Sequence, residues 1–332
     1  MNRPSRYAFI LAKIYGRLRK TYVEANYQDL LRLKRLEEVS ETLFPGERTP
    51  ATEENLSSDL EGRIVRAGIR SMIQVLALLR NPDPILVHIL RRLEYQNVKS
   101  VIRSLVRGEG EKPVILDLGR YATLRLPEKG RDVEKALASS PYAWTLPHVR
   151  SRPLFEIENM LDRDYYKRLL GLARKLPRED RTGVLRLVNL ETSLADVSWA
   201  LRLRFFFGLD LEAARPLMIP GMVHSHRRAI AEVFDLPADS AEGWRKWKYS
   251  WLVSDQLGEA FHGPDPVRAE QKAARRLVQR AHQLCHEDPF TLTPIVAYFK
   301  LKELETGMLK IAVEALHLSV SEHDVLSMLG AE

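Results

Sequence analysis

Two histidine pairs are the residues best suited to binding a metal ion. His282 and His286 lie one helical turn apart with Cys285 beside the second, and His224 lies two residues before His226. Zinc sites need about four ligands at recognisable spacing, and the helical protease site needs the motif HExxH. Neither pattern is present. The sequence therefore predicts no metal site and assigns these histidines to the surface or to helix ends.

The candidate nucleophile and the paired acids likewise indicate no catalytic site. Ser225 lacks a glycine-flanked nucleophile elbow, and Asp162 and Asp164 fall at a predicted helix start, where carboxylates favour the helix dipole. The sequence has no Walker loop and no GxGxxG fingerprint. We therefore predict no catalytic residue, no cofactor and no small-molecule ligand, and an enzyme is the less favoured class.

Composition and charge set the broad class. The chain has 332 residues, of which 45% are hydrophobic and 29% charged, which is typical of a folded soluble protein of two or three domains. A single cysteine excludes an internal disulfide and fits a reducing compartment. The net charge of +7 favours an acidic partner, whether nucleic acid, anionic lipid headgroups or protein. No apolar run approaches the roughly 20 residues of a membrane span, so we expect a cytoplasmic protein with only indirect membrane contact.

One stretch, residues 86–108, is predicted to form a single helix around which the chain is organised. Its apolar face includes Leu86, Leu90, Leu93 and Val101, together with one amide, Asn97. A buried amide needs hydrogen-bond partners. Glu94 lies one turn earlier and is within reach along the helix.

Part of this helix is repeated later in the chain. NVKSVIR at 97–103 is matched 99 residues further on by DVSWALR at 196–202, and more weakly by KELETGMLKI at 302–311. Repetition at this spacing predicts an all-α fold of three related helical-bundle units. The predicted units are residues 1–120, 121–221 and 222–332. The repeat positions are Glu94, Asn97, Arg103, Asp196, Arg202 and Glu303.

The rest of the chain is also mainly helical in pattern. Helices are predicted at about 6–43 (one helix or a pair), 54–80, 155–176, 184–207, 263–286 and 290–317, with a short one at 320–329. Residues 113–126 alone have strand-like character, as a short hairpin or a connection. The apolar block Phe205–Phe207 before Gly208 is interpreted as core or as a packing seam between units.

Three tryptophans are predicted to share one face of a helix. Trp244, Trp247 and Trp251 lie one turn apart in GWRKWKYSW. Aromatic and basic stripes can stack on nucleic-acid bases, but they more often bury against a neighbouring element. We therefore treat these residues as core or as a candidate protein interface.

Five segments, in their order along the chain, carry a resemblance to one known family. They are YAFILAKIYGRL at 7–18, LEYQNVKSVIR at 93–103, LDRDYYKRLL at 161–170, ADVSWALRLRFFFGLD at 195–210 and YFKLKELETGMLKIAVEAL at 298–316. With these segments the chain resembles the central stalk component of rotary V/A-type ATPases, which is known as the C subunit in archaeal and bacterial complexes and as the d subunit in vacuolar ones. The resemblance covers nearly the whole chain, although residues 234–290 match poorly.

This resemblance implies a fold and a mechanical role. The fold is three helical units around a pseudo-threefold axis, forming a funnel. The funnel caps the membrane proteolipid ring and receives the tip of the axle made by the D and F subunits, so that torque passes between them without catalysis. The repeat positions would orient helices within each unit. From the +7 charge we further expect a basic funnel interior that suits an acidic axle tip or acidic ring loops.

A second function class uses the same residues differently. The basic N-terminal helix and the tryptophans at 244–251 would also suit a helical nucleic-acid-binding protein. Steep salt dependence of binding to generic DNA or RNA would support that alternative. If the family resemblance holds, no nucleic acid is expected as a partner.

Overall fold

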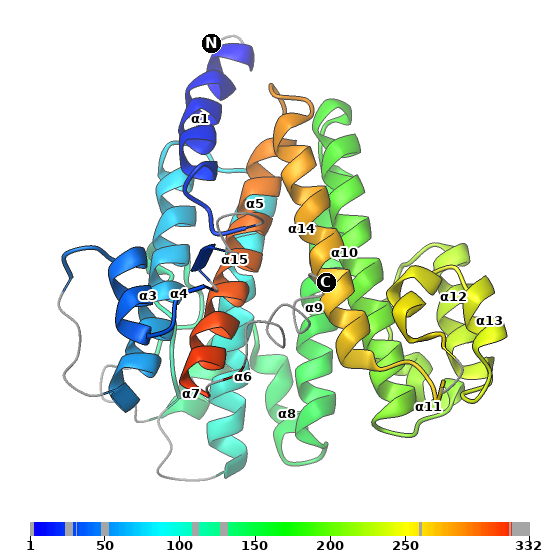
Figure 1. Ribbon diagram of the computed structural model, residues 1–332. Helices are drawn as coiled ribbons and strands as arrows, with labels where there is room; N and C mark the ends of the chain where they lie inside the picture. Colours follow the sequence, from blue (N-terminus) through cyan, green and yellow to red (C-terminus); the bar gives the residue numbers. More distant parts are fainter. Residues whose placement is uncertain are drawn as a thin grey trace.

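The computed structural model describes residues 3–23, 29–30, 32–47, 53–107, 113–126, 132–258, 261–318 and 320. Every regular element among these residues is a helix, as the all-α prediction requires (Figure 1). The long helices are α1 (Arg3–Leu18), α4 (Glu53–Ala77), α6 (Arg92–Arg107), α9 (Leu154–Lys175), α10 (Arg178–Phe205), α14 (Pro266–His286) and α15 (Thr293–His317). The short ones are α3 (Leu36–Leu43), α5 (Pro84–Leu90), α7 (Val133–Ala138), α8 (Leu146–Val149), α11 (Leu211–Ala214), α12 (His224–Asp235) and α13 (Ala241–Lys246). No described helix is long and apolar enough to cross a membrane.

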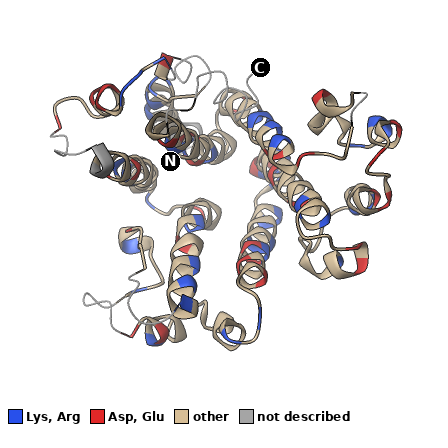
Figure 2. Cartoon of the chain, turned by 60° about the horizontal axis from the view of Figure 1, so that its bottom comes forward, with Lys and Arg blue, Asp and Glu red and all other residues tan. Residues whose placement is uncertain are grey.

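The long helices form three consecutive pairs that close into a ring. α4 is paired with α5 and its continuation α6, α9 with α10, and α14 with α15. Each pair also contacts the next one, because α5 and α6 pack on α9, α10 packs on α14, and α15 returns to pack on α4. Figure 2 shows these helices obliquely, arranged around the middle of the molecule. One pair falls within each predicted unit, while the unit boundaries themselves stay predictions.

Helix starts follow from local sequence. The Asp83 side chain accepts a hydrogen bond from the Ile85 backbone N–H at 3.0 Å, and Pro84 occupies the first turn of α5. Asp265 caps α14 in the same way, accepting from the Val267 N–H at 2.8 Å. An aspartate cap satisfies a free N–H, and proline fits the first turn because its missing N–H would be unpaired there.

The predicted single helix over 86–108 is wrong in one respect, because it is broken at Arg91. This residue has φ −66° and ψ −6°, which ends α5 before α6 begins. The Arg91 side chain leaves the helix pair and donates from Nε to the Tyr121 carbonyl at 3.0 Å. The break therefore coincides with an attachment point for the segment that follows α6. Gly108 lies outside the described residues.

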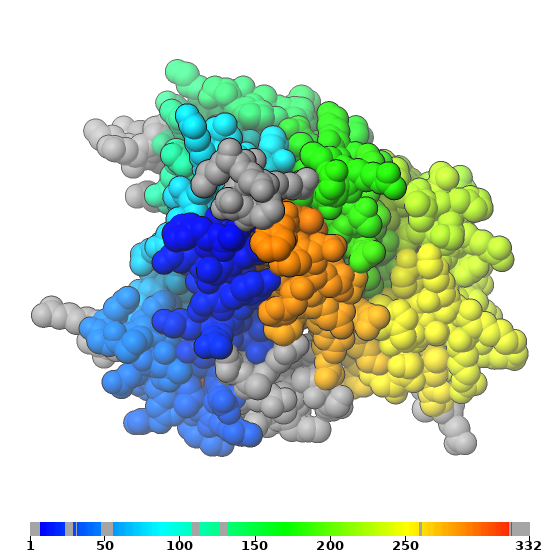
Figure 3. Space-filling model, turned by 90° about the horizontal axis from the view of Figure 1, so that it is seen from above, coloured from blue at the N-terminus to red at the C-terminus, as the bar shows by residue number. Residues whose placement is uncertain are grey.

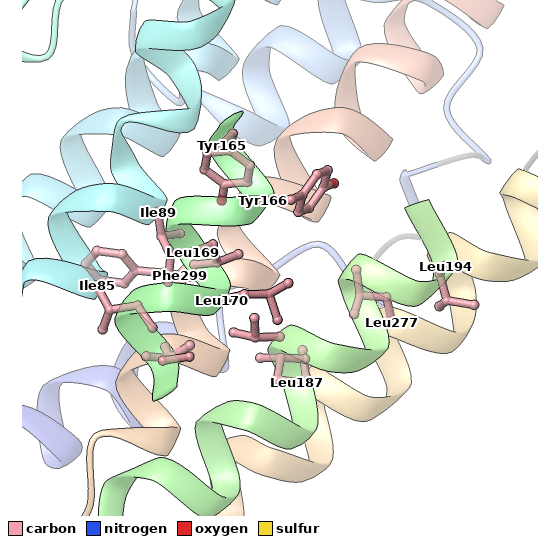
Figure 4. Packing of buried hydrophobic residues seen from close by; sticks show 14 of the residues in the cluster. Ile85, Ile89, Tyr165, Tyr166, Leu169, Leu170, Leu187, Leu194, Leu277 and Phe299 are labelled. Atoms are coloured by element: carbon pink, nitrogen blue, oxygen red, sulfur yellow. The ribbon is translucent and has the colours of Figure 1, made fainter. Parts of the chain in front are cut away.

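A continuous apolar core extends through the molecule and includes the end where the helices of each pair are connected. The connections at 78–83, 176–177 and 287–292 all lie toward the top of Figure 1. Figure 4 shows side chains of this core from α5, α9, α10, α14 and α15, and the labelled residues include Ile85, Ile89, Leu169, Leu170, Leu187 and Phe299. Seen from above, α1 covers this end beside the connected ends of α14 and α15 (Figure 3).

Other predictions have mixed outcomes. The helices expected at 54–80, 155–176, 263–286 and 290–317 are confirmed, and 6–43 divides into α1 and α3. Residues 113–126 form no hairpin among the described residues; they are an extended connection with one 3₁₀ turn at Gly119–Tyr121. Phe206 and Phe207 are 63% and 43% exposed, so the expectation of a core block is wrong for them. The helix predicted at 320–329 lies outside the described residues, apart from its first residue.

Candidate functional site

A cavity of about 850 Å³ lies among the helix pairs, and core residues such as Tyr165, Leu194 and Leu277 form part of its wall. Its walls come from α6, α9, α10, α14 and α15, so all three pairs contribute. The lining uses the N-terminal halves of α9 and α14 and the C-terminal half of α10. These halves lie opposite the connected helix ends, because the two helices of a pair run antiparallel (Figure 1). The cavity thus lies toward the end of the molecule opposite the helix connections.

A four-residue charge cluster forms the inner wall of this cavity. Arg92 on α6 contacts Glu191 on α10 (Nη1 to Oε1) and Glu303 on α15 (Nε to Oε1), each at 2.8 Å. The Lys300 Nζ lies 2.7 Å from the same Glu191 oxygen and also pairs with Glu303. Each helix pair contributes at least one member, so the cluster joins the whole ring at its centre.

The residues of this cluster keep one another in their charged forms. Burial would raise the pKa of Glu303, but Arg92 and Lys300 outweigh burial and hold that pKa below its usual 4.5. Burial likewise opposes the charge on Arg92, yet its acidic neighbours, Glu303 first, raise its pKa. Glu191 and Lys300 have side chains only 5% and 3% exposed, so removing either partner would leave a buried charge uncompensated.

The expectation of a basic interior is wrong. Five cationic residues line the cavity, and five acidic residues line it with them. The cations are Arg92, Lys99, Arg163, Arg202 and Lys300, and the acids are Glu158, Asp162, Glu191, Glu270 and Glu303. The formal net charge of the lining is therefore zero. Figure 2 shows the same mixture, with basic and acidic segments interspersed along the helices.

The repeated amide and carboxylate bind the backbone that follows their helices. The Asn97 side chain donates to the Leu116 carbonyl and accepts from the Leu116 N–H, both at 2.8 Å. At the equivalent position, Asp196 accepts from the Ile219 N–H at 2.9 Å, and its other oxygen lies 2.9 Å from Nε2 of the buried His226. Asn97 and Asp196 therefore have the same role in their helix pairs. Each binds the backbone of the segment that follows its helix.

Glu94 has a similar role. The sequence suggested it as a partner for Asn97, but its carboxylate binds other groups. Its fully buried carboxylate accepts four hydrogen bonds. The donors are the N–H and hydroxyl of Thr123, the N–H of Leu124 and the hydroxyl of Tyr142. A buried carboxylate is tolerated only when its oxygens are satisfied in this way.

The repeated arginines join neighbouring pairs instead of orienting helices within a unit. Arg103 on α6 contacts Glu158 on α9, with Nε 2.7 Å from Oε1. Arg202 on α10 contacts Glu270 on α14 in the corresponding place. Glu303 likewise reaches Arg92 on the first pair. In the third pair, Ala312 takes the place of the arginine, and no third bridge of this type can form there.

The sequence of the chain matches one family of known proteins. The family model described as "ATP synthase (C/AC39) subunit" matches residues 10–328, nearly the whole chain. The chain belongs to this family. An uncharacterized protein of Treponema pallidum is 25% identical over 316 residues, covering 93% of this chain and 92% of its own. The C subunit of the A-type ATP synthase of Methanosarcina barkeri is 23% identical, over 74% of this chain and 69% of its own. That of Methanococcoides burtonii is 22% identical, over 72% of this chain and 69% of its own.

Two of the three tryptophans of this C/AC39 family protein are core residues. Trp244 and Trp247 are 0% and 3% exposed, and their indole N–H groups donate to the carbonyls of Pro237 and Ala229, each at 2.8 Å. Because α13 ends at Lys246, the three do not share a helical face. Only Trp251, at 37% exposed, remains a candidate for contact with a partner. The stacking surface that the nucleic-acid alternative needs is therefore not formed.

The histidines and the cysteine do not gather into a metal centre. No group of three or more His, Cys, Asp or Glu side chains suited to a metal occurs among the described residues. His226 is buried between Asp196 and the Tyr249 hydroxyl, the latter 2.8 Å from Nδ1. His286 stacks on Tyr15 of α1 with ring centroids 5.4 Å apart. These two rings therefore connect helices, α12 to α10 and α14 to α1.

The charge cluster is the feature that sequence reasoning missed. None of Arg92, Glu191 and Lys300 is among the site residues predicted from the sequence. One signal was present: Lys300 is the only charge in the apolar run from Ile295 to Leu301. A lone lysine in such a run predicts a buried cation that needs an acid from elsewhere.

Proposed function

We propose that this chain is the non-catalytic central-stalk subunit of a rotary V/A-type ATPase or ATP synthase. It would couple the axle of the D and F subunits to the membrane proteolipid ring, so that rotation passes between catalytic head and ion-translocating ring. The observation that carries the proposal is the cavity walled by all three helix pairs. Family membership supplies the context.

The two ends of the molecule suggest its orientation. The end with the cavity would receive the axle tip, and the end with the helix connections would face the ring. In this proposal the three pairs are related by a pseudo-threefold axis and form a funnel. The protein would lie in the cytoplasm, peripheral to the membrane, and touch the membrane only through the ring.

Torque transmission needs a stiff body, and the structure supports that requirement. A closed ring of helices has no free edge that can open under load. The buried charge cluster links α6, α10 and α15, and breaking it would expose charges in a poorly hydrated environment. The protein would therefore turn as one piece, with no catalytic residue involved.

Affinity purification from the native host tests this function. The tagged protein is isolated from detergent-solubilised membranes and its partners are identified by mass spectrometry. We expect the catalytic head, the D–F axle and the proteolipid ring to copurify with about one copy of this chain. Recovery of nucleic acid, or of no membrane partner, would contradict the proposal.

A further inference from the structure

We propose that the cavity recognises an apolar, uncharged helical tip through an aromatic lip, and not through complementary charge. The aromatic lip consists of Phe155, Trp199, Phe206 and Phe207, which all line the cavity. The inference rests on the proposed function, because it specifies the chemistry of the axle tip that would enter.

The aromatic lip is an exposed apolar surface with defined internal packing. Phe206 is 63% and Phe207 43% exposed. The rings of Phe155 and Phe207 stack with centroids 4.8 Å apart and planes 22° apart, and Trp199 lies 6.0 Å from Phe207. Gly208, with φ +65°, ends the helix just beyond them and leaves them at the mouth. Clustered exposed aromatics mark protein-binding surfaces, where they supply most of the binding energy.

The acidic side chains around the lip are already paired with cations, whereas the lining cation Arg163 donates to a backbone carbonyl, that of Met218, at 2.9 Å. Asp162 lies 2.7 Å from the Lys99 ammonium, and Glu158 lies 2.7 Å from Arg103 Nε. Glu270 pairs with Arg202, and the remaining two acids belong to the charge cluster. A basic tip would have to break these pairs to find an acidic partner, and among the lining cations only Arg163 lies outside them for an acidic tip. An uncharged tip leaves them intact.

Apolar side chains continue the lip into the cavity. Leu194, Ile219, Leu277 and Leu304 line it alongside Ala273 and Ala274. A helix is roughly 10–12 Å across and rises about 5.4 Å per turn. The cavity, at about 850 Å³, thus has room for one to two turns of a helix.

Binding of the full-length chain to the host's own D–F axle tests the proposal. Calorimetry at increasing salt measures Kd for the wild type, Phe206→Ser, Phe207→Ser and the control Phe290→Ser. Phe290 is 49% exposed and lies in the connection between α14 and α15, at the opposite end. We expect Kd to change less than about threefold between low and high salt, because few charges are neutralised on binding. Each lip variant should bind at least about tenfold more weakly, as loss of a buried phenylalanine requires, and Phe290→Ser should bind normally.

The outcomes separate the two proposals. Steep weakening by salt, or normal binding by both lip variants, would overturn the apolar-tip inference while leaving the stalk function standing. No binding by the wild type would contradict the stalk function itself. Circular-dichroism melting checks that the variants fold, which is expected because both lip positions are exposed. Phe206→Leu, which keeps an apolar side chain, should bind with intermediate affinity.

Discussion

Glu94 shows how single residues of this chain hold segments that have no regular structure of their own. Its carboxylate accepts from two successive backbone N–H groups, Thr123 and Leu124, and from two hydroxyls. Asn97 does the same for Leu116. The sequence indicated that Asn97 needs a partner. It did not identify Leu116, because a backbone group in a segment without periodicity leaves no mark on the residue pattern.

Removal of the Glu94 carboxylate should be severely destabilising. Glu94→Ala leaves the buried N–H groups of Thr123 and Leu124 without acceptors, and we expect the free energy of unfolding to fall by about 3–5 kcal/mol. Reversible urea unfolding followed by circular dichroism measures this change. Glu134→Ala, at an exposed position on α7, is the matched control and should lie within about 0.5 kcal/mol of the wild type. A loss below about 1 kcal/mol for Glu94→Ala would show that its hydrogen bonds matter little.

Helices were predicted well where local chemistry marks their ends and poorly where it does not. The Asp-Pro starts of α5 and α14 are readable, since both residues act locally. The break at Arg91 has no glycine or proline to announce it. The tryptophan spacing suggested a helix through 251, but α13 ends at Lys246, and burial of Trp244 and Trp247 is decided by neighbours distant in sequence. Tertiary contacts decide where such helices end and which of these side chains are buried.

The charge cluster that joins three helices should make stability depend on acidic pH. The folded state lowers the pKa of Glu303, so its stabilising effect is complete above about pH 4.5 and is lost as the pH falls further. In Glu303→Gln we expect an unfolding free energy lower by about 1–3 kcal/mol at pH 7 and a shallower decline on acidification. Urea unfolding from pH 7 to pH 3 tests this.

Glu212→Gln serves as the control for that series. Glu212 also pairs with an arginine, Arg215, but its side chain is 78% exposed. Its pH dependence should match the wild type, since exposed pairs contribute little. Equal declines in Glu303→Gln and the wild type would mean that the cluster carries no pH-linked stability.

At the scale of the whole molecule, the repeat predicted three related parts, and the structure arranges the helices as three contacting pairs in a ring. Net charge was a poor guide to the interior. The chain carries +7, yet the cavity lining is neutral, because charge counts do not say where the excess lies. The aromatic lip was hidden for a related reason. Phe206 and Phe207 look like core residues until the fold shows that their helix ends at the cavity mouth.

Site-specific cross-linking in the assembled complex tests most directly which partner enters the cavity. The single natural Cys285 is buried, and burial raises its pKa to about 12, so it stays unreactive and an introduced cysteine is labelled alone. Phe206→Cys, carrying a short photoactivated cross-linker, should attach to a protein of the axle, whereas Phe290→Cys should not. Attachment of Phe206→Cys to the proteolipid ring, or of Phe290→Cys to the axle, would contradict the account.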